Sequence, residues 1–250
     1  MATPILSTRE LTWGVGGFTI LEDITLDVLQ GEFLSIIGPN GAGKTSLLNV
    51  ISGVSLARSG TVHLGGDDIT DLRPARRVQR GLGRTFQTSS LFPGLTLVEN
   101  ARLAAQAARG GSLSLISRPR WRDDATQAGL GALEEVGLAE RANAPVTDLS
   151  HGDKRKLEIA LLLCTDPDVL LLDEPTAGVS VEEVDALVAV IRAVHARGRT
   201  VVMVEHRMEL VVDASDRIAV LHNGRLLTVG SPDAVMADPI VQSAYLGETA

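Results

Sequence analysis

The segment GPNGAGKT, from Gly38 to Thr45, has the residue types and the spacing of a phosphate-binding loop. It follows an apolar stretch typical of a strand and leads into KTSLLNVIS, which is typical of a helix. The glycines let successive backbone N–H groups surround a phosphate, and the helix start adds a partial positive charge. Lys44 can then reach the outer phosphates, and the Thr45 hydroxyl can ligate Mg²⁺. A chance glycine turn is the alternative, and the flanking strand and helix disfavour it.

Two acidic residues end the apolar run VLLLDE, from Val169 to Glu174. The pattern predicts a buried strand, and ligands of parallel sheets bind beyond the carboxyl ends of the strands. Asp173 is therefore predicted to hold Mg²⁺, directly or through water, and Glu174 to orient and deprotonate a water that attacks the terminal phosphate. A helix N-cap cluster in DEPTAG is the simpler interpretation, but the phosphate-binding loop in the same chain favours the catalytic one.

Two further polar residues lie where strands are expected to end: Gln87 closes GRTFQ, and His206 closes TVVMVEH. Taken singly, a glutamine is usually a surface residue, and a histidine is more often a satisfied core residue than a catalytic one. With the phosphate-binding loop and VLLLDE, however, they make four strand ends that converge on one crevice. We therefore expect Gln87 and His206 to belong to the same site.

The segment DLSHGDKRKLE, from Asp148 to Glu158, places Ser150 and Gly152 ahead of an apolar helix face. Unsatisfied N–H groups, the Ser150 hydroxyl and the helix dipole would all point toward a potential anion. On the bare sequence an ordinary capped helix is the favoured interpretation, and an anion site is the alternative. The two are compatible, because the same atoms can serve both purposes.

These residues must be positioned by an alternation of strands and helices. Strands are expected in ILSTRELTW, FTILEDITLDV, EFLSIIG, TVHLGGDDI, LGRTFQ, DVLLLDE and RTVVMVEH, and a hairpin in DRIAVLHNGRLLTVG with its turn at Asn223-Gly224. Three consecutive helical segments are expected at about 96–108, 121–136 and 152–164, and another helix at 182–196. The alternation predicts an α/β fold with a mostly parallel, helix-covered sheet and a helical insertion.

Composition bounds the function. A net charge of -8 over 250 residues argues against wrapping nucleic acid, and a single cysteine excludes an internal disulfide framework. The start of the chain lacks the features of a secretory signal, and no apolar run approaches the roughly 18 residues of a membrane span, so the cytosol is expected. The one local basic group has helical spacing: Arg73, Arg76, Arg77 and Arg80. A solvated helix face is the favoured interpretation, and contact with a partner or lipid headgroups is the alternative.

In order and separation, these motifs resemble those of the ATP-binding subunits of ABC transporters, over nearly the whole chain. GPNGAGKT matches the Walker A motif of that family, Gln87 its Q-loop, LSHGDK its signature motif, VLLLDE its Walker B motif and His206 its switch histidine. Several segments are further similar to the subunits of branched-chain (hydrophobic) amino-acid importers, which closely resemble those of urea and short-chain amide importers. These segments are GRTFQTSSLFPGLTLVENARLA, RGGSLSLISRPRW, KLEIALLL, DEPTAGVS and AYLGE.

The resemblance implies one domain over 1–250 with a phosphate-loop NTPase (RecA-like) core and an antiparallel β subdomain. It also implies an inserted helical subdomain at 88–164 and a C-terminal helical tail at 231–250. ATP and Mg²⁺ are the implied cofactors. The implied catalytic residues are Lys44, Gln87, Glu174 and His206, and the implied metal-binding residues are Thr45, Gln87 and Asp173. The implied nucleotide-binding residues are Gly38, Pro39, Asn40, Gly41, Ala42, Gly43, Lys44, Thr45, Ser46, Trp13, Val15, Ser150 and Gly152.

The resemblance also implies partners. Two ATPase subunits, identical or paralogous, enclose two nucleotides, and the signature motif of one contacts the phosphate held by the other. Membrane permease subunits and a separate solute-binding protein complete such a system, which places this chain in the cytoplasm at the inner face of the membrane, without nucleic acid. A soluble ABC protein of translation or DNA repair is the alternative, but such proteins generally carry paired cassettes or long insertions. A phosphate-loop GTPase or small-molecule kinase would lack a use for LSHGDK, and no Asn-Lys-x-Asp sequence occurs.

The chain departs from the family motifs at several positions. His151 replaces the first glycine and Asp153 the glutamine of the usual LSGGQ, and Ser180 stands at the usual acidic position of the D-loop. An acid at 153 weakens the attraction for a phosphate unless Lys154 or Arg155 compensates for its charge. Val15 stands where an aromatic residue normally stacks on adenine. Trp13, on the same strand face, is a candidate substitute, and a core position for it is equally plausible.

Overall fold

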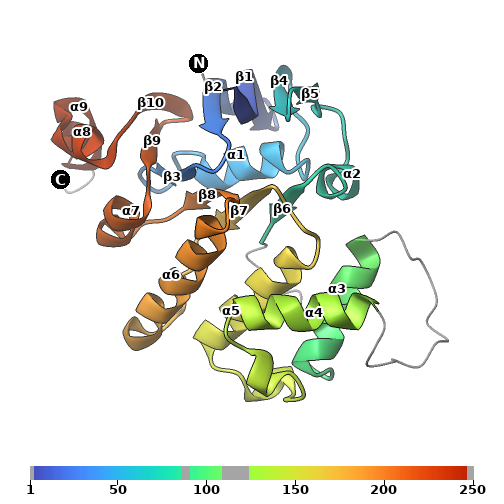
Figure 1. Ribbon diagram of the computed structural model, residues 1–250. Coiled ribbons are helices and arrows are strands. Elements are labelled where there is room, and N and C mark those ends of the chain that lie inside the picture. The colour runs from blue at the N-terminus through green and yellow to red at the C-terminus, as the bar shows by residue number, and fades with distance from the viewer. Residues whose placement is uncertain (1–2, 86–90, 109–123, 247–250) are drawn as a thin grey trace.

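The computed structural model describes residues 3–85, 91–108 and 124–246. Within these residues the chain forms two β-sheets and a set of helices (Figure 1). The larger sheet has the strand order β10-β9-β3-β8-β7-β6 and is parallel except for the β9–β10 pair. Its strands are β3 (Phe33–Ile37), β6 (Leu82–Arg84), β7 (Val169–Asp173), β8 (Thr200–Val204), β9 (Arg217–His222) and β10 (Arg225–Gly230).

The two faces of the central strands pack into different cores. Leu170 and Leu172 of β7 join a core that includes α5 and α6, whereas Val169 and Leu171 join one that includes α1, β1 and β2. This is the side-chain alternation of a strand, and every residue of β3, β7 and β8 is buried. A parallel sheet covered on both faces favours such buried, mostly apolar strands. The predicted α/β class is confirmed.

The smaller sheet is antiparallel and has the order β2-β1-β4-β5. It consists of β1 (Pro4–Val15), β2 (Phe18–Leu29), β4 (Ser59–Leu64) and β5 (Asp67–Asp68). The helices that accompany the two sheets are α1 (Lys44–Ile51), α2 (Pro74–Val78), α6 (Val181–Ala196), α7 (Met208–Ala214), α8 (Pro232–Ala237) and α9 (Pro239–Leu246). Of these, α7 was not expected, because seven residues with two adjacent valines give a weak helical signal.

A helical region lies to one side of the sheets (Figure 1). It contains α3 (Leu97–Ala108), α4 (Asp124–Glu135) and α5 (His151–Leu163), which pack against one another. Two short 3₁₀ turns, Ala139–Arg141 and Val146–Asp148, join α4 to α5. These helices overlap the segments expected at 96–108, 121–136 and 152–164, whereas the connector at 109–121 lies outside the described residues. The limits 88–164 and 231–250 stay predictions.

The expected hairpin between β9 and β10 is present, with Asn223 at φ 47° and Gly224 at φ 75°. Two successive positive φ angles are what the favoured two-residue hairpin turn requires. Gly224 is further constrained by a close approach, because a Cβ there would lie 2.1 Å from the carbonyl oxygen of Ile20. The hairpin turn therefore packs directly against β2.

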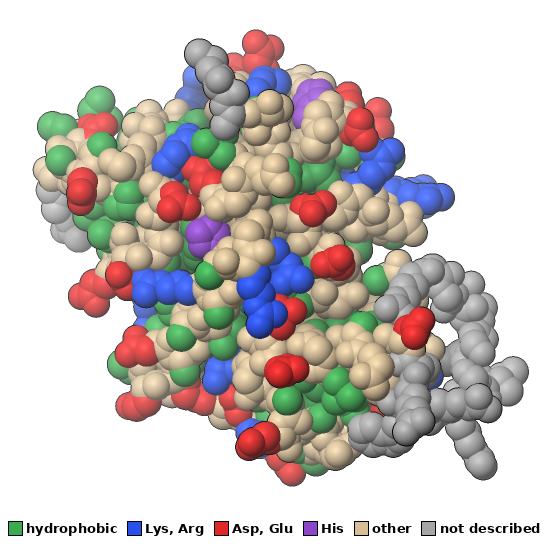
Figure 2. Space-filling view, in the orientation of Figure 1, with side chains coloured by type: hydrophobic (Ala, Val, Ile, Leu, Met, Phe, Trp, Pro, Cys, Tyr) green, Lys and Arg blue, Asp and Glu red, His purple; other side chains and the backbone are tan. Residues whose placement is uncertain are grey.

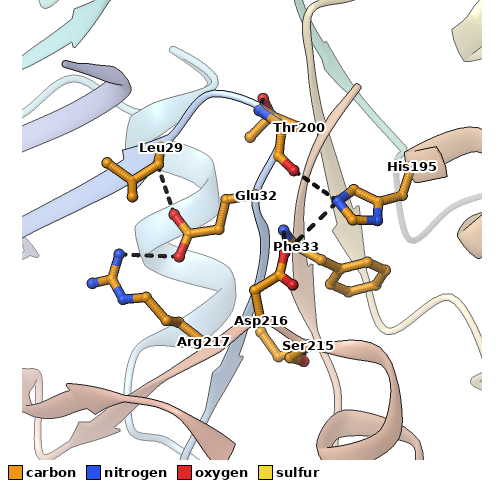
Figure 3. Close-up of polar contacts among 10 residues, drawn as sticks. Leu29, Glu32, Phe33, His195, Thr200, Ser215, Asp216 and Arg217 are labelled. Atoms are coloured by element: carbon orange, nitrogen blue, oxygen red, sulfur yellow. Dashed lines mark hydrogen bonds and ion pairs between the residues drawn. The ribbon is translucent and has the colours of Figure 1, made fainter. Parts of the chain in front are cut away.

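Polar side chains fix the amino end of β3 (Figure 3). The buried Glu32 accepts a hydrogen bond from the Leu29 N–H at 2.6 Å and pairs with Arg217 at 3.0 Å. Asp216 accepts from the Phe33 N–H at 2.8 Å, and the His195 ring meets the Phe33 ring edge-on. These contacts tie the start of β3 to the start of β9 and to α6. His195 therefore has the ordinary structural role expected for it.

Acidic and basic side chains are interspersed over the face of the molecule in Figure 2. In the part of the chain that the structure describes, no helix combines the length and the apolar character needed to cross a bilayer.

The interpretation of the four arginines as one solvated face is wrong for Arg77. Only 1% of Arg77 is exposed, because its guanidinium turns inward from a helix of only five residues. Arg77 donates to the carbonyl oxygens of Val50 and Ile51, at the end of α1, and to those of Thr70 and Leu72. It thus satisfies terminal carbonyl groups of α1 and places a positive charge at the negative end of that helix dipole. Burial lowers the pKa of Arg77 to about 10, so it stays protonated at neutral pH.

Replacing Arg77 with methionine should therefore lower the free energy of unfolding by about 2–4 kcal/mol, because buried carbonyl groups lose their donors. Chemical denaturation would measure the change. Arg76→Met is the matched control, since Arg76 is exposed on the same helix and bonds only to the exposed Gln79 in the contacts described. Its effect should stay within about 0.5 kcal/mol. Equal unfolding midpoints for the two variants would contradict this assignment.

Candidate nucleotide site

The phosphate-binding loop connects β3 to α1, as predicted. Gly41 and Gly43 have φ angles of 79° and 99°, and a Cβ on Gly38 would lie 2.1 Å from the Leu221 carbonyl oxygen. Glycine is required at these positions, because other residues rarely adopt such angles and would not fit beside β9. Asn40 is exposed at the loop, and Pro39, also in the loop, is buried. The remaining loop residues are Ala42, which is buried, and Thr45 and Ser46, which are half-buried in the first turn of α1.

Lys44 is the first residue of α1, and its side chain follows the inside of the loop. Its ammonium group donates to the carbonyl oxygens of Gly38, at 2.6 Å, and Pro39, at 2.9 Å. The group is therefore held inside the loop, at its first two residues.

Asp173, at the end of β7, faces the start of α1. The Thr45 hydroxyl donates to one carboxylate oxygen of Asp173 at 3.3 Å, and Arg84 of β6 pairs with the other at 3.1 Å. The Asp173 side chain is 0% exposed and the Arg84 side chain 6% exposed. Burial raises the pKa of Asp173, while the charge and hydrogen bond of Arg84 act in the opposite direction.

Sequence reasoning missed Arg84. The signal was a single charged residue inside the strand LGRTFQ, which was expected to be buried. A buried guanidinium needs an acidic partner, and the acidic residues at the end of VLLLDE were the obvious choice. Arg84 also donates to the Ser52 hydroxyl at 2.8 Å, which connects β6 to the end of α1.

Glu174 and His206 are in direct contact. The Glu174 carboxylate lies 2.7 Å from Nε2 of His206, and both side chains are partly exposed. Glu174 has a φ of 48°, an angle that non-glycine residues rarely adopt, and its N–H donates to the Val204 carbonyl oxygen. Such strain persists where the surrounding structure imposes it and is common at functional sites. The strand ends of β7 and β8 therefore present an acid and a histidine side by side.

A second buried acid, which the sequence did not single out, fixes the segment after Glu174. Glu205 is buried and accepts hydrogen bonds from the Thr176 N–H at 3.0 Å and from its hydroxyl at 2.6 Å. These two bonds tie the turn that follows β7 to the end of β8. The turn therefore has little freedom to carry Glu174 away from His206.

Ser150 and Gly152 lie elsewhere, at the start of α5. Figure 1 shows α5 in the helical region, away from α1. The Ser150 hydroxyl accepts a hydrogen bond from the Asp153 N–H, so the expected helix cap is present. Asp153 is paired with Arg141 at 2.6 Å and Lys156 at 3.4 Å. These partners compensate for its charge, in place of Lys154 and Arg155, the two residues that sequence reasoning named.

The structure thus brings Lys44, Thr45, Asp173, Glu174 and His206 to one edge of the large sheet and leaves Ser150 and Gly152 apart from them. Gln87 lies outside the described residues. Thr45 and Asp173 offer hard oxygen donors of the kind that Mg²⁺ prefers, with phosphate oxygens and water to complete its shell. No cluster of three or more His, Cys, Asp or Glu side chains suited to a metal occurs in the described parts of the chain.

The β1–β2 hairpin presents the candidate adenine contacts. Trp13 is partly buried against the core that contains α1, whereas Val15 is 57% exposed near the hairpin tip. Sequence reasoning missed Phe18, which pairs with Val15 across the hairpin and is 79% exposed. The hairpin lies close to the loop, since a Cβ on Gly43 would be 2.7 Å from the Leu21 side chain. The adenine contact of Trp13 or Val15 stays a prediction, and Phe18 becomes a further candidate.

A mostly parallel sheet with a glycine-rich loop between β3 and α1, and with acidic residues at the end of β7, one strand beyond the adjacent β8, is the arrangement of a phosphate-loop nucleotide-binding protein. Residues 21–177 match the family model described as ABC transporter. Residues 225–250 match a second model, described as branched-chain amino acid ATP-binding cassette transporter.

Similar proteins agree with these models. The chain is 37% identical to LivG of Escherichia coli K12, a high-affinity branched-chain amino acid transport ATP-binding protein, over 99% of this chain and 100% of LivG. A crystal structure of an ATP-binding cassette of an ABC transporter, in its ADP conformation, superposes with a TM-score of 0.87 at 30% identity, covering 98% of this chain and 100% of the other. A dimeric cassette in a post-hydrolysis state, bound to ADP and Pi, superposes with a TM-score of 0.74 at 25% identity, covering 91% of this chain and 98% of the other.

The chain belongs to the ATP-binding subunits of the ABC transporter family. It is an ATPase and binds nucleotide, and the predictions of the family, of the fold and of the ATPase activity are confirmed.

Proposed function

We propose that this chain is the ATP-hydrolysing subunit of an importer that takes up branched-chain or other amino acids through separate permease subunits. The match of residues 225–250 to the branched-chain amino acid transporter model supports this solute class, and so does the full-length likeness to LivG. The chain would work in the cytoplasm, at the inner face of the membrane, with a solute-binding protein in the same system. Urea or short-chain amides are the other solutes considered, and these comparisons favour amino acids.

The observation that carries the hydrolytic mechanism is the contact between Glu174 and His206 beside the phosphate-binding loop. In our proposal Glu174 orients a water and accepts its proton, and His206 holds the Glu174 carboxylate in position. Lys44 and the N–H groups of the loop bind the phosphates. Thr45 and Asp173 would hold Mg²⁺, which neutralises phosphate charge when bound, and Gln87 is proposed to complete the site.

The second half of each site comes from another subunit in this proposal. Ser150 and Gly152 lie on α5, apart from the loop of their own chain, at a helix start suited to an anion. Paired subunits, identical or paralogous, would place this helix start against the phosphate held by the partner. The dimeric cassette among the similar structures supports such pairing.

A pocket beside β6 supports a contact with the permease. It lies between α2, β6 and α5 and has a volume of about 240 Å³, and apolar side chains of Val78, Leu82, Leu161 and Leu162 contribute to its lining. Arg84 and Thr85 also line it, directly before the segment that contains Gln87. A permease loop in this pocket would contact Arg84, which pairs with Asp173 of the nucleotide site.

Replacing Glu174 with glutamine should leave ATP binding intact and lower phosphate release by about 10²-fold or more, because the amide cannot accept the proton. Fluorescent-nucleotide binding and a phosphate-release assay would measure the two effects. Glu209→Gln is the control, since Glu209 is exposed on α7. Unchanged phosphate release by the Glu174 variant would remove this residue from the role of base.

Mixed subunits would test the shared site. Lys44→Ala and Ser150→Arg should each be inactive alone, since each damages both sites of a symmetric pair. Random mixing makes half of the pairs mixed. In each mixed pair, the unaltered Lys44 of one subunit meets the unaltered Ser150 of the other at one of the two sites, so about a quarter of the wild-type rate should return. ATP hydrolysis measured after mixing at equal concentrations gives the result, and no recovery would count against sharing.

Uptake in the source organism would test the solute. Deleting the gene should reduce uptake of labelled leucine, and the wild-type chain should restore it, whereas Glu174→Gln should not, because transport depends on repeated hydrolysis. Uptake of an unrelated sugar serves as the control. Loss of urea uptake with intact leucine uptake would contradict the amino-acid assignment.

A further inference from the structure

A carboxylate of the same chain lies against the start of α5. Glu183, in the first turn of α6, packs against Gly152 so closely that a Cβ there would lie 3.0 Å from the Cβ, Cδ and Oε1 atoms of Glu183. Hydrogen bonds to the Ser150 hydroxyl, and further ones to Ser180 and to the Gly152 N–H, lower the pKa of Glu183. Glu183 therefore carries its charge at neutral pH, at the positive end of the α5 dipole.

Local helix capping does not account for this contact. Ser180 is the N-cap of α6 and Glu183 lies three residues later, which is the pattern of a capping box. In that motif the serine hydroxyl would accept from the Glu183 N–H, but Ser180 makes no side-chain cap bond. Its hydroxyl donates instead to the Glu183 carboxylate at 3.1 Å. Ser180 thus helps to hold the carboxylate against the start of α5.

The helix start against which Glu183 lies is the one that the proposed function gives to the phosphate of the partner's nucleotide. A hydroxyl and an N–H at a helix start can satisfy one anion, and two anions at the same place repel each other. We infer that Glu183 is a further functional residue of the shared site: its carboxylate occupies the place of the partner's phosphate in the separate subunit and is displaced when two subunits pair. This inference rests on the proposed function of Ser150 and Gly152.

The surroundings allow such an exchange. Glu183 is half-buried on a side chain with several rotatable bonds, so it can turn toward solvent without unfolding α6. Gly152 has no side chain in the way. Asp153 is already paired with Arg141 and Lys156, so it does not replace Glu183 as the anion at the helix start. Displacing Glu183 costs part of the binding energy that ATP supplies for pairing, and Glu183 therefore raises the ATP concentration at which subunits pair.

The test uses the full-length chain with Glu174→Gln, in which ATP-bound pairs should persist. Pair formation is measured by analytical ultracentrifugation over a series of ATP concentrations, with Glu183→Ala, Glu183→Gln or Glu182→Gln added. Glu182 is the matched control, because it is an exposed acid in the same helical turn. The midpoint ATP concentration should fall about tenfold with Glu183→Ala, the effect of losing a hydrogen-bonded charge. It should fall less with Glu183→Gln, which keeps the size of the side chain, and should not change with Glu182→Gln.

A midpoint equal to or above that of the Glu182 control would overturn the inference, since it would mean that Glu183 supports pairing or has no part in it. ATP binding to dilute, unpaired subunits should be the same for all variants, and a change there would place the effect outside the shared contact and also overturn it. A failure of the proposed function can be distinguished from a failure of this inference alone. Glu174→Gln alone would then form no ATP-dependent pairs, and the inference would fall with it.

Discussion

The ion pair between Asp173 and Arg84 is the interaction on which the nucleotide site depends. A carboxylate withdrawn from water costs several kcal/mol unless it is paired and hydrogen-bonded. Asp173 meets this requirement with a guanidinium from β6 and a hydroxyl from the first turn of α1. The buried charge therefore binds together three segments that are distant in sequence, and it does so at the sheet edge where the loop and Glu174 also lie.

The same principle operates at the opposite end of the sheet. Glu32 and Asp216 satisfy backbone N–H groups where β3 begins, and Arg217 neutralises Glu32. At its other end β3 continues into the phosphate-binding loop, whose helix is closed by Arg77. The strand that carries the loop is thus fixed by polar contacts on both sides of an apolar core. A shift of β3 would have to break the Asp216 hydrogen bond at its start or the Lys44 hydrogen bonds to Gly38 and Pro39 that follow its end.

Local patterns were sufficient for much of this architecture. Mostly apolar runs identified β3, β7 and β8, the glycine spacing identified the loop, and Asn223-Gly224 identified a hairpin. Arg77 was misjudged because helical spacing says which residues share a face but not that one of their side chains turns inward to the end of α1. Arg84 and Glu183 were missed because their partners, Asp173 and Gly152, lie far away in the sequence. Contacts between residues that are distant in sequence leave no periodic pattern in the sequence.

The signature segment shows how one set of atoms can serve as a cap and as an anion site. Ser150 closes α5, while Glu183 lies against Gly152 of the same helix start. The acid at 153 faces Lys156 because residues three positions apart share a helix face, whereas Lys154 and Arg155 point elsewhere. With Asp153 paired, its charge has little influence on a phosphate at the helix start. The electrostatic character of this start is then set by Glu183 and Ser180, from the beginning of α6, rather than by the departures within the motif itself.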